Sequence, residues 1–332
     1  MGDNNIRSKD GQLVKVGPDR LTVPQFLRRV AAHLEGEGEA ADSDLAWLAP
    51  ALLGGGLPAV RAQAREETWV QLAFTPPDGN EPTPLYRVLA DAARGLLSGG
   101  DVGDFFFVNK PPGVRARFRT LPDHREQVEA RMQELAQVWR RDGLIAGWRP
   151  AVYEPEQHLF GGPASMRSVH RVFTADSLVW LDAHGAQPPV GPTWVLSLLL
   201  IRALFAEMGV DGWENRDVWD RLRRQAGRHF EGGEPEGWPR AAAALRAAWK
   251  DPDRLWSKLA PTAGPMVARF QEAVKGEFPH WDRAYFSMPT AYVGPREAAA
   301  FLIVFHWNRA RMPFSRQCAI TEALWSAPTA LS

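Results

Sequence analysis

The chain has 332 residues, which is enough for one large domain or two smaller ones, each with its own hydrophobic core. Its 39 Lys and Arg residues balance 39 Asp and Glu residues, so no net charge draws it to nucleic acid or to a membrane surface. The single cysteine, Cys318, excludes an intramolecular disulfide and any Cys-x-x-Cys metal site.

The first 20 residues are polar and charged, and we expect them to form a disordered leader without the apolar segment of a signal peptide. Residues 21–66 show mostly helical spacing of apolar side chains, which predicts a small amino-terminal helical module. The longest apolar run, 194–205, is too short to span a bilayer. Together these features predict a cytoplasmic protein.

Residues 67–155 alternate between strand-like and helical patterns. The predicted strands are 68–74, 104–109, 114–119 and 148–153, and helical spacing covers 85–97 and 123–141. The resulting order βαββαβ is that of a ferredoxin-like sheet with two helices on one face. Residues 156–328 are predicted to be mostly helical, with helices at 166–181, 192–207, 213–228, 239–249 and 255–274 and a last one that begins at Pro295. The sequence therefore predicts an α+β fold.

Arg115, Arg117 and Arg119 alternate along one predicted strand, so their side chains point to the same face of the sheet. Three like charges on one face repel one another unless water or an anion compensates them. Two interpretations stay open at this point. One is a cleft that binds carboxylates or amide carbonyls, and the other is a solvated outer face.

The segment 153–163 places Glu154, Gln157 and His158 at the end of a predicted strand. The pair Gly161-Gly162 follows and opens onto a predicted helix, whose free N–H groups favour negative or carbonyl oxygen atoms. Such a corner between strand and helix is a common place for a functional site. The alternative is a tight turn with solvated acids.

Tyr285, Ser287 and Tyr292 lie in an irregular segment just before the helix at Pro295. A phenol can donate a proton, and a serine hydroxyl can orient a carbonyl or an imidate. No Gly-x-Ser-x-Gly pattern surrounds Ser287, which argues against a hydrolase nucleophile. The alternative is that the segment only caps and packs the helix.

The sequence contains no Walker motif and no dinucleotide-binding glycine pattern. His158 and His306 have no acidic partner at the spacing of metal ligands, so we expect no metal site. The chemistry is therefore expected to need no cofactor and to depend on protons, hydrogen bonds and shape.

Several motifs in collinear order resemble the C-terminal elimination domain of lantibiotic dehydratases, over about residues 67–328. They are the run from Phe106 to Phe118, Tyr153-Glu154-x-Glu156, Phe160-Gly161-Gly162-Pro163, Phe173-x-Ala175-Asp176-Ser177 and the late His306-x-Asn308-Arg309. The resemblance implies an enzyme that acts on a ribosomally made precursor peptide. Under it, the module at 21–66 is a candidate for binding the leader of that peptide.

Eliminases of this family remove glutamate from glutamylated Ser or Thr, which leaves a dehydroamino acid. The resemblance implies two catalytic arginines and a histidine. The first arginine is kept here as Arg115 or Arg117, but the second falls on Leu159 and the histidine falls on Val304. Because an apolar side chain can neither bind a carboxylate nor move a proton, these losses argue against elimination.

The thiopeptide pyridine synthases, a branch of the same family, fit these departures better. They resemble eliminases in fold but perform a formal aza-(4+2) cycloaddition between two dehydroalanines of a thiazole-bearing peptide. The resemblance implies Ser287 and Tyr292 as catalytic residues. It implies that the remaining candidates bind substrate: Arg115, Arg117, Arg119, Glu154, Gln157, His158, Tyr285, His306 and Asn308.

Two alternatives stay open. The first is a glutamate eliminase with a rearranged site, in which His306 replaces the missing imidazole. The second is a non-catalytic subunit that recognises the peptide and presents it to a separate dehydratase. The sequence does not determine the oligomeric state, the ring size or the precursor.

Overall fold

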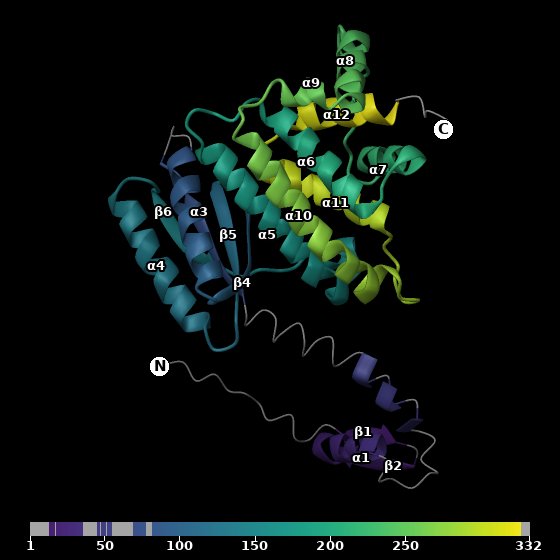
Figure 1. Ribbon diagram of the computed structural model, residues 1–332. Helices are drawn as coiled ribbons and strands as arrows, with labels where there is room; N and C mark the ends of the chain where they lie inside the picture. Colours follow the sequence, from purple (N-terminus) through teal and green to yellow (C-terminus); the bar gives the residue numbers. More distant parts are fainter. Residues whose placement is uncertain are drawn as a thin grey trace. The chain divides into compact units, whose positions relative to one another are not determined.

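The computed structural model describes residues 13–16, 18–35, 45–46, 48–50, 52–54, 69–77 and 82–326. The chain divides into two compact units, residues 1–67 and 68–332. Each unit has its own hydrophobic cluster, and helices and antiparallel strands together confirm the α+β class (Figure 1).

The amino-terminal unit contains a β-hairpin that the sequence analysis missed. Strands β1 (Leu13–Val16) and β2 (Asp19–Thr22) pair antiparallel, and helix α1 (Val23–Glu35) follows directly. The expectation of a disordered leader over 1–20 is therefore wrong for these strand residues, and residues 1–12 lie outside the described part. The hairpin forms because β-branched Val14 and Val16 alternate with polar residues ahead of a turn, and Val16 packs with Phe26 and Val30 of α1.

The larger unit begins with the six elements expected from the sequence. They are β3 (Trp69–Thr75), α3 (Thr83–Ser98), β4 (Val102–Lys110), β5 (Gly113–Thr120), α4 (Arg125–Arg141) and β6 (Gly147–Ala151). The strands form one sheet in the order β4-β5-β3-β6, and every pair is antiparallel. Strand β6 ends at Ala151, two residues earlier than predicted, so Tyr153 lies in the connection that follows.

The two faces of this sheet have different neighbours. Phe74 packs against Trp139 of α4 and Phe107 packs against Tyr86 of α3, so these two helices cover one face (Figure 1). On the opposite face Phe106 contacts His170 and Phe173 of the long helix that follows the sheet. Because side chains alternate along a strand, Arg115, Arg117 and Arg119 share this second face, as predicted.

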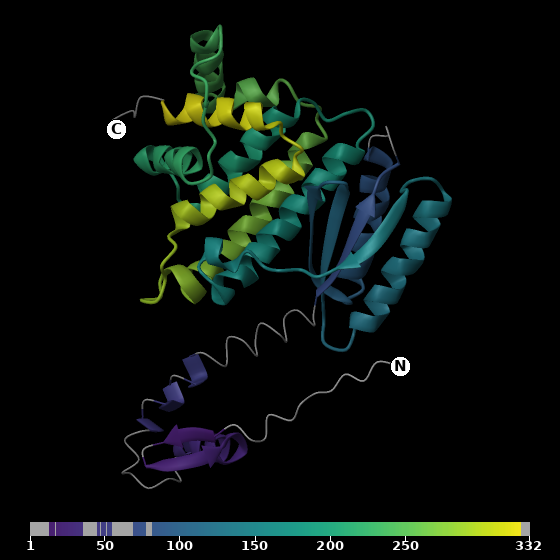
Figure 2. The ribbon, with the colours of Figure 1, turned by 180° about the vertical axis from the view of Figure 1, so that it is seen from behind.

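The rest of the unit is helical, again as predicted. Its elements are η1 (Gln157–Phe160), α5 (Pro163–Gly185), α6 (Thr193–Met208), α7 (Gly212–Arg224), α8 (Trp238–Lys250), α9 (Asp253–Trp256), α10 (Ala263–Trp281), η2 (Asp282–Phe286), α11 (Pro295–Arg309) and α12 (Phe314–Trp325). Helices α5, α10 and α6 lie side by side, as two opposite views of the ribbon show (Figures 1 and 2). The helix expected over 255–274 is in fact two, α9 and α10, separated by a connection that contains Pro261.

The free edge of β4 is closed by side chains of α5 and α11. The backbone N–H of Phe105 donates to Thr174 Oγ1 at 3.0 Å, and that of Phe107 donates to Ser177 Oγ at 3.3 Å. The third alternate N–H, of Asn109, donates to Asn308 Oδ1 at 2.8 Å. These bonds replace the partner strand that an edge strand lacks and fix both helices against the sheet.

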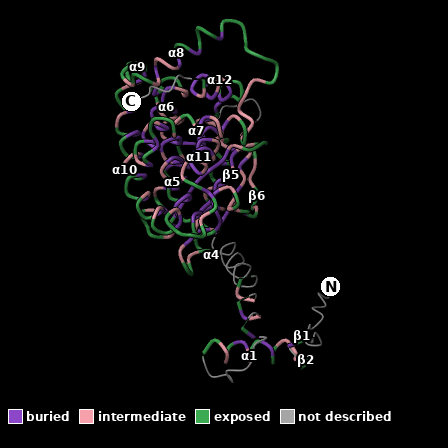
Figure 3. Tube along the Cα trace, turned by 90° about the vertical axis from the view of Figure 1, so that its right-hand side faces the viewer, coloured by how far each residue is buried: buried purple, intermediate pink, exposed green. Residues whose placement is uncertain are grey.

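Buried residues gather along the sheet and the central helices of the larger unit (Figure 3). Within the residues that the structure describes, no helix has both the length and the apolar character needed to cross a membrane.

Candidate functional site

A cavity of about 560 Å³ lies where β4, β5, the 152–156 connection and α11 meet. This volume is in the range of ordinary small-ligand sites. Of the residues singled out from the sequence, Arg117 and Asn308 line it. Its other walls come from the end of β4, the segment after α7, the turn after α11 and the start of α12.

Arg117 is the most constrained charge in this cavity. Only 6% of its surface is exposed, and its Nε donates to Gln71 Oε1 at 2.6 Å. The rings of Phe106 and Tyr153 lie 4.9 and 4.5 Å from its guanidinium carbon. Burial lowers the pKa of Arg117, and the nearby carboxylate of Glu156 opposes that shift. Arg117 is therefore held in one orientation by contacts on three sides.

Glu156 supplies the only carboxylate among the lining residues that the structure describes. Its Oε1 lies 3.9 Å from Arg117 Nη1, which is an ion pair but too long for a hydrogen bond. Its Oε2 and Arg117 Nη1 are both buried and have no hydrogen-bond partner among the described residues. Burial, then the charge of Glu156, raise the pKa of Tyr153, so this phenol stays protonated beside the pair.

Three further cations line the cavity: Lys110, Arg228 and Arg311. Arg228 donates its Nε to Gln317 Oε1 at 3.0 Å, and burial lowers the pKa of Arg228. Arg311 has φ of 53°, a backbone conformation that is rare for a residue other than glycine. Backbone conformations of this kind persist only where the surrounding structure holds them, and they are frequent at functional sites.

Helix α11 presents an apolar wall to the cavity. Val304 and Phe305 line it, and Val304 is the position where the resemblance to eliminases leads one to expect a histidine. Within the described part of the chain no histidine lines this cavity. The amide of Asn308 is already engaged, because Nδ2 donates to the backbone oxygen of Asn109 at 2.8 Å and Oδ1 accepts from its N–H. Asn308 thus shapes the cavity while it closes the edge of β4.

His306 does not line the cavity, contrary to its predicted role in substrate binding. It is 5% exposed, its Nδ1 lies 2.7 Å from Asp176 Oδ1, and its Nε2 lies 2.8 Å from Ser197 Oγ. Asp176 also accepts from Arg309 Nε at 2.5 Å, so the three side chains form a buried network that joins α5 to α11. Burial would raise the pKa of Asp176, but His306 and Arg309 lower it below its usual value.

The other two strand arginines are not part of the cavity wall. Arg119 Nε donates to the buried carboxylate of Asp104 at 2.5 Å, which compensates its charge. Burial raises the pKa of Asp104, against the effect of Arg119. Arg115 is half-buried on the same face. The predicted cleft of three arginines is therefore a site for one of them, Arg117.

The glycine corner is a second feature, at the other end of η1 from Glu156. Gly161 and Gly162 have φ of 87° and 93°, and Pro163 starts α5, so the predicted corner between strand and helix exists. A Cβ atom on Gly161 would lie 1.8 Å from Tyr285 Oη, and one on Gly162 would lie 3.7 Å from Tyr292 Oη. The corner therefore requires glycine at Gly161 for space as well as for conformation.

Tyr285 and Tyr292 lie at this corner, and neither they nor Ser287 lines the cavity. Tyr285 is buried, and its Oη accepts from the N–H groups of Tyr292 and Val293 at 3.2 and 3.0 Å, so it fixes the loop before α11. Ser287 is exposed and donates to Asp282 Oδ2 at 3.1 Å. Tyr292 is 67% exposed.

The remaining predicted residues lie on the segment between the two features. Glu154 and His158 are exposed, and Gln157 is half-buried at the start of η1. None of the three lines the cavity. Among the described residues, no three His, Cys, Asp or Glu side chains form a group that would hold a metal ion.

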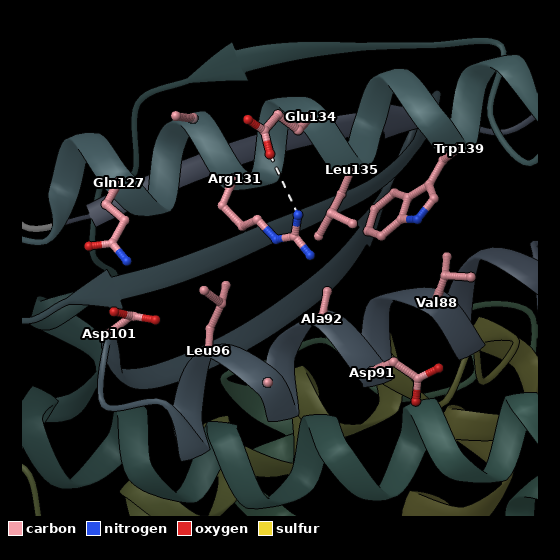
Figure 4. Close-up of a pocket in the computed structure, with 12 residues that line it drawn as sticks. Val88, Asp91, Ala92, Leu96, Asp101, Gln127, Arg131, Glu134, Leu135 and Trp139 are labelled. Carbon is pink, nitrogen blue, oxygen red and sulfur yellow. Dashed lines mark hydrogen bonds and ion pairs between the residues drawn. The ribbon is translucent and has the colours of Figure 1, made fainter.

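A larger cavity, of about 760 Å³, lies between α3 and α4 on the opposite face of the sheet (Figure 4). It is lined by side chains such as Val88, Leu135 and Trp139, and Arg131 contacts Glu134 at 3.5 Å along α4. None of the residues predicted from the sequence lines it, and none of the buried polar atoms without a partner lies there. The smaller cavity is therefore the better candidate.

Comparison with known proteins agrees with the motifs. The sequence pattern of the family described as lantibiotic biosynthesis dehydratase C-term matches residues 69–327. The chain belongs to this family. It is also similar to the crystal structure of the tRNA dependent lantibiotic dehydratase MibB from Microbispora sp. 107891, with a TM-score of 0.57 and 18% sequence identity. This likeness covers 78% of the chain but 27% of MibB, and at such identity it establishes the shared fold alone. No curated protein sequence matches the chain significantly.

The charged lining residues that sequence reasoning missed are Lys110, Glu156, Arg228 and Arg311. Glu156 stands in the quoted motif Tyr153-Glu154-x-Glu156, but strand alternation ends at Ala151 and cannot distinguish it from Glu154. Arg228 and Arg311 come from connections between helices, where no periodicity indicates direction.

Proposed function

We propose that this family member is a pyridine synthase that performs a formal aza-(4+2) cycloaddition on a precursor peptide, built on a ferredoxin-like sheet. The observation that carries the proposal is the apolar Val304 on the cavity wall beside Arg117, since an eliminase needs a group there that transfers a proton. Leu159, at the position of the second eliminase arginine, is likewise apolar and packs against the core.

The reaction needs no oxidant. The amide that precedes one dehydroalanine tautomerises to an imidic acid, which gives a 2-azadiene, and two carbon–carbon bonds then form with the second dehydroalanine. Loss of water and of the leader peptide as a carboxamide leaves the aromatic pyridine. Proton transfer by Tyr292, with Ser287 holding the imidate hydroxyl, would contribute about 10²–10⁴-fold to the rate.

A peptide that lies along 156–162 would reach both features of the site. The four residues of η1 rise by roughly 8 Å, which is about the length of two to three extended residues. Such a peptide would contact Arg117 and Glu156 at one end and Tyr292 beside Gly162 at the other. Holding two reacting groups of one peptide in contact is itself a large source of rate.

The test is the cyclisation of a synthetic thiazole peptide with two dehydroalanines, followed by mass spectrometry. Loss of water and of the leader carboxamide is expected with the unaltered protein. Ser287→Ala and Tyr292→Phe are each expected to slow the reaction about 10²-fold or more. Ser326→Ala, at an exposed serine after α12, is the matched control. Wild-type rates for both site variants would contradict the assignment.

One observation keeps a glutamate eliminase as a second candidate. This candidate does not use His306, because the histidine is buried in the network with Asp176 and does not line the cavity. Glu156, however, has a free carboxylate oxygen beside Arg117 and could remove the α-proton of a glutamylated serine. Loss of glutamate from a glutamylated peptide, without cyclisation of the dehydroalanine peptide, would favour this candidate.

A further inference from the structure

Arg117 and Glu156 leave two complementary polar atoms unused at the cavity. Arg117 Nη1 is a donor and Glu156 Oε2 is an acceptor, and both are buried without a hydrogen-bond partner among the described residues. A buried polar atom of a charged side chain without a hydrogen-bond partner is unfavourable, because it has lost its contacts with water and gained none in return. Two such groups side by side, in a protein that satisfies most of its buried polar atoms, indicate an unfilled binding position.

The surroundings of Arg117 restrict where a ligand can approach. Gln71 occupies Nε, and the rings of Phe106 and Tyr153 cover the guanidinium. The remaining approach is at Nη1 of Arg117, which lies 3.9 Å from Oε1 of Glu156, and both residues line the cavity. A ligand there meets a donor from Arg117 and an acceptor from Glu156 together.

A primary carboxamide matches this pair. Its oxygen accepts from Arg117, and the N–H on the same side of the amide donates to Glu156, in the manner of a two-point planar contact. A trans secondary amide of a peptide backbone does not match, because its N–H points away from its oxygen. A carboxylate satisfies Arg117 but places a second negative charge against Glu156, and close like charges are unfavourable.

We infer that Arg117 and Glu156 form a clamp for a primary carboxamide of the peptide substrate or product. The inference rests on the proposed function, in which the leader departs as a carboxamide, and it assigns that leaving group to this end of the cavity. A side-chain carboxamide of Asn or Gln has the same chemistry. The cations Lys110, Arg228 and Arg311 on the other walls make a carboxylate the competing ligand.

The test measures binding, without turnover, by ligand-observed NMR on the full chain. The probes are N-acetylglycinamide, its N-methylamide, the carboxylate N-acetylglycine, and N-acetylasparagine N-methylamide. We expect N-acetylglycinamide to bind at least tenfold more tightly than the N-methylamide or the carboxylate. If the asparagine probe also binds, the clamp accepts the side-chain carboxamide of Asn as well as a terminal carboxamide. If the asparagine probe does not bind, the clamp accepts only a terminal carboxamide.

A variant checks the role of charge. Glu156→Gln keeps the size of the side chain and removes its charge, so the ratio of carboxamide to carboxylate affinity should fall at least tenfold. Glu297→Gln is the matched control, because Glu297 is also a half-buried partner of an arginine, at 3.0 Å from Arg221, outside the cavity. Unchanged thermal midpoints verify the fold of both variants.

Three results would overturn the inference. They are equal binding of carboxamide and carboxylate to the unaltered protein, equal binding of carboxamide and N-methylamide, and binding of none of the probes. The last would mean that Arg117 and Glu156 simply close on each other in solution. Each of these results leaves the cyclisation test unaffected, since a protein can cyclise its peptide without this clamp and can bind a carboxamide without cyclising anything.

Discussion

Asp176→Asn should strongly destabilise the larger unit. Asp176 is 2% exposed and joins two partners, His306 at 2.7 Å and Arg309 at 2.5 Å. Asparagine keeps the volume but removes the charge, which leaves the guanidinium of Arg309, itself 1% exposed, without a counter-ion. Arg309 Nη1 already lacks a partner among the described residues, so no second acceptor is in place to compensate.

The expected loss is about 3–5 kcal/mol, the usual cost of removing one partner from a buried ion pair. That is a large share of the roughly 5–15 kcal/mol by which a folded protein is stable. The measurement is urea denaturation followed by tryptophan fluorescence, since thirteen of the fourteen tryptophans belong to the larger unit, that is, all but Trp47.

Asp182→Asn is the matched control. Asp182 also joins two arginines, Arg94 at 2.5 Å and Arg269 at 2.8 Å, but these side chains are 39% and 60% exposed. Water therefore screens the pairs, and the same substitution should cost at most about 1 kcal/mol. Equal losses for the two variants, or a loss below about 1 kcal/mol for Asp176→Asn, would refute the reasoning. Arg309→Met added to Asp176→Asn should recover part of the loss, because it removes the unpaired cation.

Three further results are expected. The pKa of Asp176 is lower in the folded than in the unfolded protein, so its ionised form adds to the free energy of unfolding at neutral pH. This stabilisation is lost as the pH falls below about 4. The urea midpoints of wild type and Asp176→Asn should therefore converge only in that acid range. Asn308→Ala should cost about 2–4 kcal/mol in the same assay, because it deletes two hydrogen bonds of 2.8 Å and leaves the N–H and oxygen of Asn109 unpaired. Both Gly161 and Gly162 have positive φ, but only Gly161→Ala places a methyl group 1.8 Å from Tyr285 Oη. Gly161→Ala should therefore be much more destabilising than Gly162→Ala, and a comparison of the thermal midpoints of the two variants checks this order.

The sheet could be predicted from the sequence because its strands carry clear alternation. Arg115, Ala116, Arg117 and Phe118 pair with β3 in the register that places all the arginines on one face. The amino-terminal hairpin could not be predicted, since four-residue strands in a polar segment give too short a pattern. The break between α9 and α10 was missed because the apolar spacing on either side of Pro261 stays in phase.

The site was predictable only in part, because its members are set by tertiary packing. Alternation shows which way Arg117 points, but its burial depends on Phe106, Tyr153 and Glu156, which no local pattern brings together. His306 looked like a site residue because it stands beside Asn308 in a motif. Its acidic partner, Asp176, lies 130 positions earlier in the chain, and helical packing alone brings the two together.

Helix α11 connects the architecture of the fold to the chemistry of the cavity. Asn308 and Arg309, at its end, anchor it to β4 and to Asp176, while Val304, one turn earlier, faces the cavity. The side chains of both anchors bond to other parts of the protein, whereas Val304 is half-buried and has no polar side-chain atoms to satisfy. A change at this one position can therefore alter the chemistry of the cavity wall while the helix stays in place. Under the proposed function, this separation of anchor from wall would let one fold serve either elimination or ring closure.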